Sequence, residues 1–235
     1  MSNLGMLYGL GVGPGDPELI TVKAFRMLKE CPVIAYPKKL RGSKSYAQRI
    51  VDVYINPAEK EMVGLVFPMT KDEEVLNREW RKSVEEIYLH LAAGKDVAFV
   101  TEGDPMLFST FIHLMKLMQE LYPEVPIETI PGISSFNGSA NRLGIPLADG
   151  DEHVAMIPAH DDMDAMRKAI ENHDAVVFIK VAKVIDEMLV LLKEMGLYNR
   201  AHVVTKVTSD EEIIWQLDDL AGAELNYLSC MVVRK

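Results

Sequence analysis

The sequence lacks several features that define whole classes of protein. It contains no apolar stretch of about 18 residues, which a membrane-spanning helix would require, so we expect no contact with a membrane. Its two cysteines, Cys31 and Cys230, are far apart and form no Cys-x-x-Cys pair, which argues against a disulfide framework. The opening segment MSNLGMLYGLGVGPGDPE has no basic region before an apolar core, as a signal peptide would. These absences predict a cytoplasmic protein.

The histidines also lack the paired spacing of metal ligands, so we expect no protein-bound metal. The six are His90, His113, His153, His160, His173 and His202. Four methionines at helical spacings are expected to fill a core: Met163, Met166, Met188 and Met195.

Acidic residues also outnumber basic ones in this sequence. The formal net charge is -10, and 49% of the residues are hydrophobic, which is typical of a globular chain with a well-buried core. A negatively charged surface repels the phosphate backbone, so we expect no nucleic-acid partner. An acidic small molecule stays open as a ligand if positive charge is concentrated locally.

Short apolar runs alternate with longer amphipathic segments, a pattern typical of an α/β fold with mainly parallel strands. The segment 121–126 carries two prolines and is predicted as a linker. It would separate an N-terminal α/β domain, residues 1–123, from a C-terminal α/β domain, residues 127–235. Strands are expected at 6–10, 33–36, 97–100, 154–157, 175–179, 202–207, 213–217 and 228–233.

Helix boundaries follow from capping residues. Asp16 before Pro17 predicts a helix starting at Pro17, and Thr70 with Glu73 forms a capping box before a helix that Gly94 ends. Further helices are expected at 109–121 and 183–195.

A glycine-rich loop, GLGVGPGDPELIT over residues 9–21, follows the first expected strand. It does not have the GxGxxG spacing of dinucleotide-binding loops, and no GK[ST] follows as in a Walker A loop. Asp16 and Glu18 occupy the start of the helix, where a pyrophosphate would have to bind. Two readings stay open: a tight turn, or a glycine-lined wall that a ligand approaches closely.

Two further loops are expected beside the first. A second Gly-Asp-Pro, at residues 103–105, follows the strand 97–100, and IPGISS spans residues 130–135. In an open parallel sheet, ligands bind beyond the carboxyl ends of the strands. Both Gly-Asp-Pro loops are therefore expected at that edge.

The ordered set GxGPGDPELIT, EGDP followed by Ser-Thr, and IPGISS resembles the tetrapyrrole (corrin/porphyrin) methylases over nearly the whole chain. Within that family the sequence is most similar to the subgroup that methylates carbon 20 of precorrin-2 or cobalt-factor II in cobalamin synthesis. The resemblance implies two α/β domains with the active site in the cleft between them, a homodimer, and S-adenosylmethionine as methyl donor. S-adenosylhomocysteine would be the product.

The resemblance also implies a set of cofactor-binding residues. Two positions depart from the family pattern: Glu102 stands where several relatives carry Gly, and Lys180 where relatives often have a hydrophobic contact. The implied cofactor contacts are Pro14, Gly103, Asp104, Met106, Leu107, Ser134, Ser135 and Lys180.

Methyl transfer from a sulfonium is an in-line displacement that gains most from positioning and from water exclusion. A carbon acceptor must also lose a proton, and one carboxylate near the methyl group would take it. Asp104 is the candidate catalytic residue for this step. The alternative is that Asp104 is a turn or helix N-cap residue, as Asp before Pro usually is.

Positive charge is concentrated between Cys31 and Val51, a stretch without any acidic residue. The implied substrate is an anionic tetrapyrrole with many carboxylates, which such a segment would attract. A solvated surface loop is the alternative. The candidate substrate-binding residues are Lys38, Lys39, Arg41 and Lys44.

Other functions stay open. Within the family, the alternatives are a uroporphyrinogen III methylase and a diphthine synthase, and the latter acts on a protein side chain and needs no carboxylate-binding cations. Outside the family, the alternatives are a non-catalytic nucleotide-binding module and a nucleotide-dependent reductase. The failed GxGxxG spacing argues against the reductase.

Overall fold

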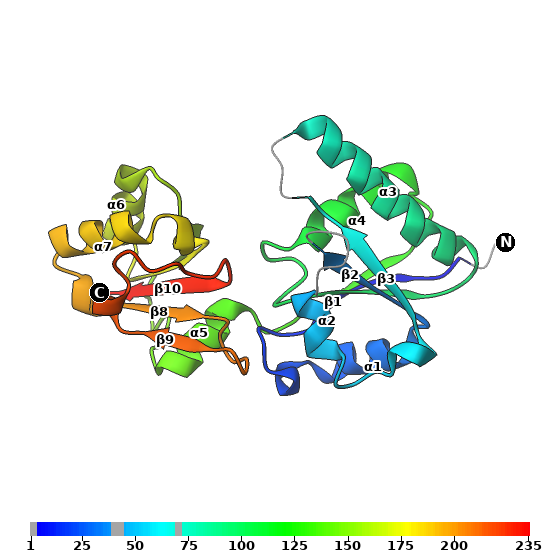
Figure 1. The fold of residues 1–235 in the computed structure, drawn as a ribbon, viewed down its shortest axis with the longest axis horizontal. Helices are drawn as coiled ribbons and strands as arrows, with labels where there is room; N and C mark the ends of the chain where they lie inside the picture. Colours follow the sequence, from blue (N-terminus) through cyan, green and yellow to red (C-terminus); the bar gives the residue numbers. More distant parts are fainter. Residues whose placement is uncertain (1–3, 39–44, 69–71) are drawn as a thin grey trace. The chain divides into compact units, whose positions relative to one another are not determined.

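The computed structural model describes residues 4–38, 45–68 and 72–235. The chain forms two compact units, which divide between Ser134 and Ser135 (Figure 1). Within the described ranges, no helix has both the length and the apolarity needed to cross a bilayer. The same ranges hold no cluster of three or more His, Cys, Asp or Glu side chains suited to a metal ion.

The first unit is built on a parallel sheet with strand order β3-β2-β4-β1-β5. The central strand β4 is buried along its whole length, as expected of a strand covered on both faces of a parallel sheet. The strands are β1 (Leu7–Gly11), β2 (Val33–Lys38), β3 (Glu61–Val66), β4 (Val97–Thr101) and β5 (Ile127–Ile130).

Helices cover both faces of this sheet. Helices α1 (Val22–Glu30) and α2 (Tyr46–Val51) pack on one face, in a cluster that includes Leu10 and Ile34. Helices α3 (Glu73–Ala92) and α4 (Thr110–Leu121) pack on the other, in a cluster that includes Leu7 and Val33 (Figure 1). Because successive strand residues point to opposite faces, each strand supplies both cores.

The expected helix starts need two corrections. Asp16 does cap a helical turn, but that turn is a 3₁₀ helix of three residues, Pro17–Leu19, and the extended Ile20 ends it. The α-helix begins at Val22, capped by the side chain of Thr21. The capping residue of α3 is Asp72, which accepts from the N–H groups of Glu74 and Val75 at 3.0 and 3.2 Å. Thr70, predicted as that cap, lies outside the described residues.

The expected domain boundary also differs from the structure. Strand β5 pairs with β1 at the edge of the first sheet, so residues 121–126 connect α4 to β5 inside the first unit. The N–H of Leu7 donates to the carbonyl of Pro126, which extends this ladder into the predicted linker. The two prolines therefore mark the end of α4 and the start of a short edge strand, not the boundary between the units.

The second unit contains a mixed sheet with strand order β6-β7-β10-β8-β9. Only β6 and β7 pair in parallel; the other three pairings are antiparallel. The two-part α/β fold is confirmed, but mainly parallel pairing holds for the first sheet alone. The strands are β6 (Val154–Pro158), β7 (Ala175–Ile179), β8 (Ala201–Thr205), β9 (Ile213–Trp215) and β10 (Ser229–Arg234).

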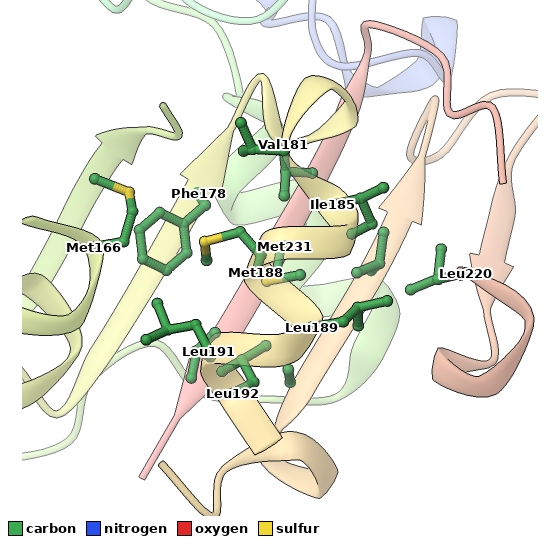
Figure 2. Close-up of a cluster of buried hydrophobic side chains, with 14 of the residues drawn as sticks. Met166, Phe178, Val181, Ile185, Met188, Leu189, Leu191, Leu192, Leu220 and Met231 are labelled. Atoms are coloured by element: carbon green, nitrogen blue, oxygen red, sulfur yellow. The ribbon is translucent and has the colours of Figure 1, made fainter. Parts of the chain in front are cut away.

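Helices α6 (Met163–Asn172) and α7 (Ile185–Glu194) bury their apolar sides on this sheet (Figure 2). Met166 and Met188 lie against Phe178 and Met231 in this core, which confirms the expected role of these two methionines. Helix α5 (Ser135–Leu143) contacts strand β10.

Candidate functional site

Three loops leave the first sheet at the carboxyl ends of adjacent strands. Strand β1 lies between β4 and β5 and runs parallel to both, so the three strands end at the same edge. The loop after β1 contains Pro14, the loop after β4 contains Asp104, and the loop after β5 leads to Ser134. These are the three motifs that the sequence analysis expected to find together.

The backbones of these loops touch at Gly11, Gly103 and Gly132. We call this contact the glycine junction. A Cβ atom added to Gly132 would lie 2.1 Å from the carbonyl oxygen of Gly103, and one added to Gly11 would lie 2.5 Å from the nitrogen of Gly132. The N–H of Gly103 also donates to the carbonyl of Gly13 at 2.8 Å. Close approach of backbone explains why side chains are missing at Gly11 and Gly132, whereas Gly103 has a left-handed φ of 68° that favours glycine.

Asp104 links two of the loops through its carboxylate. Oδ1 accepts a hydrogen bond from the N–H of Met106 at 2.8 Å, within its own loop. Oδ2 accepts from the N–H of Gly132 at 3.0 Å, in the loop after β5. Each oxygen therefore accepts one backbone hydrogen bond that fixes a loop, which favours the turn-residue interpretation of Asp104 over that of a general base.

Hydroxyl groups hold both ends of the Asp104 loop. The side chains of Thr101, at the end of β4, and Ser109, before α4, are buried and hydrogen-bonded at 3.0 Å. Ser109 also caps α4, since its Oγ accepts from the N–H of Phe111 at 3.1 Å. These bonds fix the two ends of the loop that carries Asp104 and Met106.

Apolar side chains stand exposed beside the glycine junction. Met106 and Phe108 are 47% and 49% exposed, although both are large and hydrophobic. Phe108 has φ 52°, in the left-handed region that bulky residues rarely adopt. The family motif pointed to Met106 and Leu107 but not to Phe108. Its strained backbone leaves no signal in the sequence.

The other expected residues of the first unit are also placed. Pro14 is buried, and its carbonyl accepts from the hydroxyl of Tyr46 at 3.4 Å. Ser134 is buried as well, and its Cα would lie 3.8 Å from a Cβ added to Gly103. Pro14, Asp104 and Ser134 therefore belong to one connected set of loops.

Of the four candidate substrate-binding residues, Lys38 alone is described. Lys38 ends β2, with its Nζ 5.0 Å from the centre of the Tyr36 ring, and its side chain lies across Gly64. Lys39, Arg41 and Lys44 lie outside the described residues.

Ser135 and Lys180 belong to the second unit. The Oγ of Ser135, at the start of α5, lies 3.6 Å from the Sγ of Cys230 on β10. Cys230 pairs with Ile179 on β7, and Lys180 follows directly with a left-handed φ of 59°. Ser135 and Lys180 therefore flank the beginning of β10.

Comparison with known proteins gives matches over nearly the whole chain. The family model described as tetrapyrrole (corrin/porphyrin) methylases matches residues 6–221. A relative from Methanocaldococcus jannaschii, named "Probable cobalt-precorrin-2 C(20)-methyltransferase", is 36% identical over 231 residues, covering 97% of this chain and 96% of the relative. The cobalt-precorrin-2 C(20)-methyltransferase of Salmonella typhimurium is 33% identical over 235 residues, covering 98% of this chain and 97% of the relative.

A solved structure has the same fold. Uroporphyrin-III C-methyltransferase from Thermus thermophilus, in complex with S-adenosylhomocysteine, matches with a TM-score of 0.68 at 21% identity. The match covers 98% of this chain and 92% of that protein. At this identity the likeness supports the fold and not the substrate.

Proposed function

Because this chain belongs to the tetrapyrrole (corrin/porphyrin) methylase family, we propose that it transfers a methyl group from S-adenosylmethionine to carbon 20 of precorrin-2 or its cobalt complex. The observation that carries the proposal is the 36% identity, over 97% of this chain, to a relative named for that reaction. The glycine junction supports it from the structure, since it joins the three family motifs in one place.

The residues of the first unit fit the methyl donor. At Gly103, a side chain would come no closer to other atoms than 3.8 Å, so the missing side chain leaves the backbone next to Ser134 open to a ligand. Met106 and Phe108 offer exposed apolar surface beside it. S-adenosylmethionine, when bound, supplies a methyl group on a positively charged sulfur.

The protein's own task in this reaction is positioning. The loops at the glycine junction hold a fixed backbone surface, and burial of Met106 and Phe108 under a ligand would exclude water from the reacting groups. In this proposal Asp104 orients the loops, because both of its oxygens already accept backbone hydrogen bonds.

Lys38 is the described candidate for contact with a carboxylate of the anionic tetrapyrrole. Lys38→Ala is expected to raise the KM for the tetrapyrrole and to leave the KM for S-adenosylmethionine unchanged. Lys116→Ala, which removes an exposed lysine from α4, is the matched control. Equal effects of the two variants would contradict a specific role of Lys38.

The proposal also covers the cellular compartment and the oligomeric state of the enzyme. We infer a cytoplasmic homodimer, and the two free cysteines, both buried, support a reducing compartment. Sedimentation analysis of the purified chain tests the dimer, which a monomer at all concentrations would contradict.

The function is tested by isotope labelling. The enzyme is incubated anaerobically with ¹³C-methyl S-adenosylmethionine and, in separate reactions, precorrin-2, cobalt-precorrin-2 and uroporphyrinogen III. We expect one label at carbon 20 with one or both of the first two compounds, located by ¹³C NMR. Labelling of uroporphyrinogen III alone, or at another carbon, would contradict the proposal. Gly132→Val, which fills the glycine junction, should abolish transfer, and Gly144→Ala should retain it.

A further inference from the structure

A pocket of about 180 Å³ lies in the second unit, at the end of the sheet where β8 begins and β10 ends. This is the opposite end of these strands from Ser135 and Lys180. The pocket is lined by Ile145, Asn199, Arg200, His202, Arg234 and Lys235. Four of these six side chains are basic, in a protein whose net charge is -10.

The register of the two strands brings His202 and Arg234 to one face of the sheet. Val232 pairs with His202 in the antiparallel ladder, and Arg234 lies two positions further along β10. Side chains alternate between the two faces of a strand, so Arg234 and His202 share a face. Arg200, which ends the short 3₁₀ helix directly before β8, also lines the pocket.

The charges of the pocket are only partly compensated. The Nη2 atom of Arg234 donates to the two carboxylate oxygens of Glu152 at 2.8 and 2.7 Å. Lys235 donates from Nζ to the carbonyl of Glu171, and its charge also lowers the pKa of Asp174, after the larger effect of the His153 N–H. The guanidinium of Arg200, by contrast, has neither an ion pair nor a hydrogen bond to any residue that the structure describes.

His202 adds a further donor. It is partly buried, and burial lowers its pKa, which favours the neutral ring with one N–H. Within residues 4–38, 45–68 and 72–235 that ring has no hydrogen-bond partner. The ring nitrogens of His202 reach solvent, so an oxygen of a ligand in the pocket can replace water as their partner.

We propose that this pocket binds a small oxyanion, a phosphate or carboxylate group, between Arg200, His202 and Arg234. A guanidinium is suited to such groups because its planar set of donors matches two oxygens at once. The anion would neutralise the charge of Arg200. This site is independent of the methyl-transfer function, and either proposal stands if the other fails.

The test is calorimetric titration of the whole protein in a chloride buffer of low ionic strength, with inorganic phosphate in one series and acetate in another. We expect saturable binding of at least one of the two at a single site, and the series that saturates identifies the anion. Arg200→Ala should weaken the Kd by about tenfold or more, as expected for loss of a charged hydrogen-bonding partner. Lys168→Ala, which removes an exposed lysine from α6, should bind as the wild type does.

Two outcomes would overturn the proposal. One is the absence of saturable binding of either anion to the wild-type protein. The other is an equal loss of affinity in Arg200→Ala and Lys168→Ala, which would indicate a general charge effect. Far-UV circular dichroism and the Tm of each variant verify folding. Arg200→Lys, which keeps the charge but not the planar donor set, should lie between the wild type and Arg200→Ala.

Discussion

The backbone N–H of Gly132 donates to Oδ2 of Asp104 over 3.0 Å, and this bond ties the loop after β5 to the loop after β4. The second oxygen of Asp104 accepts from Met106 in its own loop. One side chain therefore holds two of the three family motifs in a single arrangement. A carboxylate used in this way acts by positioning its neighbours.

Asp104→Asn tests this role. The asparagine keeps one acceptor oxygen, but its amide group cannot accept the second N–H, so either Gly132 or Met106 loses its partner. We expect the Kd for S-adenosylhomocysteine, measured by calorimetry, to rise by about tenfold or more, the effect of leaving one polar group unpaired.

A general base would behave differently. In that case Asp104→Asn would lower kcat and remove the acidic limb of the pH–rate profile, with an unchanged Kd for S-adenosylhomocysteine. The matched control is Asp162→Asn, which makes the same substitution at the N-cap of α6 and should leave the affinity for the cofactor product unchanged.

Gly132→Ala tests the glycine junction. The new Cβ would lie 2.1 Å from the carbonyl oxygen of Gly103, so the loops must move apart. We expect the free energy of unfolding of the first unit to fall by about 2–3 kcal/mol, as overpacking does in well-packed sites. Urea unfolding in a Trp215→Phe background measures it, because Trp80 then reports on the first unit alone.

Gly144→Ala is the comparison for this variant. Gly144 has φ 66°, but a Cβ there would meet nothing within 4 Å. Gly144→Ala therefore introduces backbone strain alone. We expect it to lower the free energy of unfolding of the second unit by about 1 kcal/mol. If Gly132→Ala were as stable as the wild type and bound S-adenosylhomocysteine equally well, the loops would not pack as described.

The sequence correctly predicted features that depend on neighbouring residues or on the general geometry of a parallel sheet. The strand 175–179 has the predicted limits, and the loops after β1, β4 and β5 lie at one edge because parallel strands end together. Asp16 caps a helical turn as expected, since Asp before Pro is a strong local signal.

Features that depend on distant parts of the chain were not predictable. Strand β3 was missed because Gly64 interrupts its apolar run, and the side chain of Lys38, on the neighbouring strand, covers that gap. The antiparallel insertion of β10 between β7 and β8 has no local signature, because a buried apolar run reads the same in both directions. The same applies to the carboxylate bond from Asp104 to Gly132, which spans 28 positions.

Cys31 is expected to be chemically inert. Burial, with a smaller contribution from Asp96, raises the pKa of its thiol to about 12, so almost no thiolate is present near neutral pH. Burial also raises the pKa of Cys230. We expect no alkylation of either residue by iodoacetamide at about pH 8 in the folded protein, measured by mass spectrometry. The control is the protein in urea, where both should react; rapid labelling of the native protein would contradict the burial.

Arg142 and Glu212 join α5 to the segment between β8 and β9. The Nε and Nη2 atoms of Arg142 donate to Oε1 of Glu212 at 2.9 and 2.5 Å, and Oε2 of Glu212 accepts from the N–H of Thr208 at 2.6 Å. Lys206 and Thr208 both have left-handed backbones in this segment. The Glu212 side chain is only 11% exposed, so the pair is better shielded from water than most surface ion pairs.

We therefore expect Arg142→Ala to lower the stability of the second unit at neutral pH, because it leaves the shielded Glu212 carboxylate without its ion pair. Arg167→Ala breaks a pair whose acid, Glu194, is 57% exposed, and should cost less than about 0.5 kcal/mol. Urea unfolding in a Trp80→Phe background isolates the second unit, since Trp215 then supplies the fluorescence.

The effect of Arg142→Ala should also depend on pH. The Arg142 side chain holds the pKa of Glu212 below its ordinary value of 4.5. A lowered pKa means that the folded state favours the ionised carboxylate, so the stabilisation is complete above about pH 5 and is lost as the pH falls through 4.5 toward the folded-state pKa. The stability difference between the wild type and Arg142→Ala should shrink over that acidic range. A difference that stays constant down to the acid transition would mean that Arg142 stabilises the loop by packing, without the ion pair.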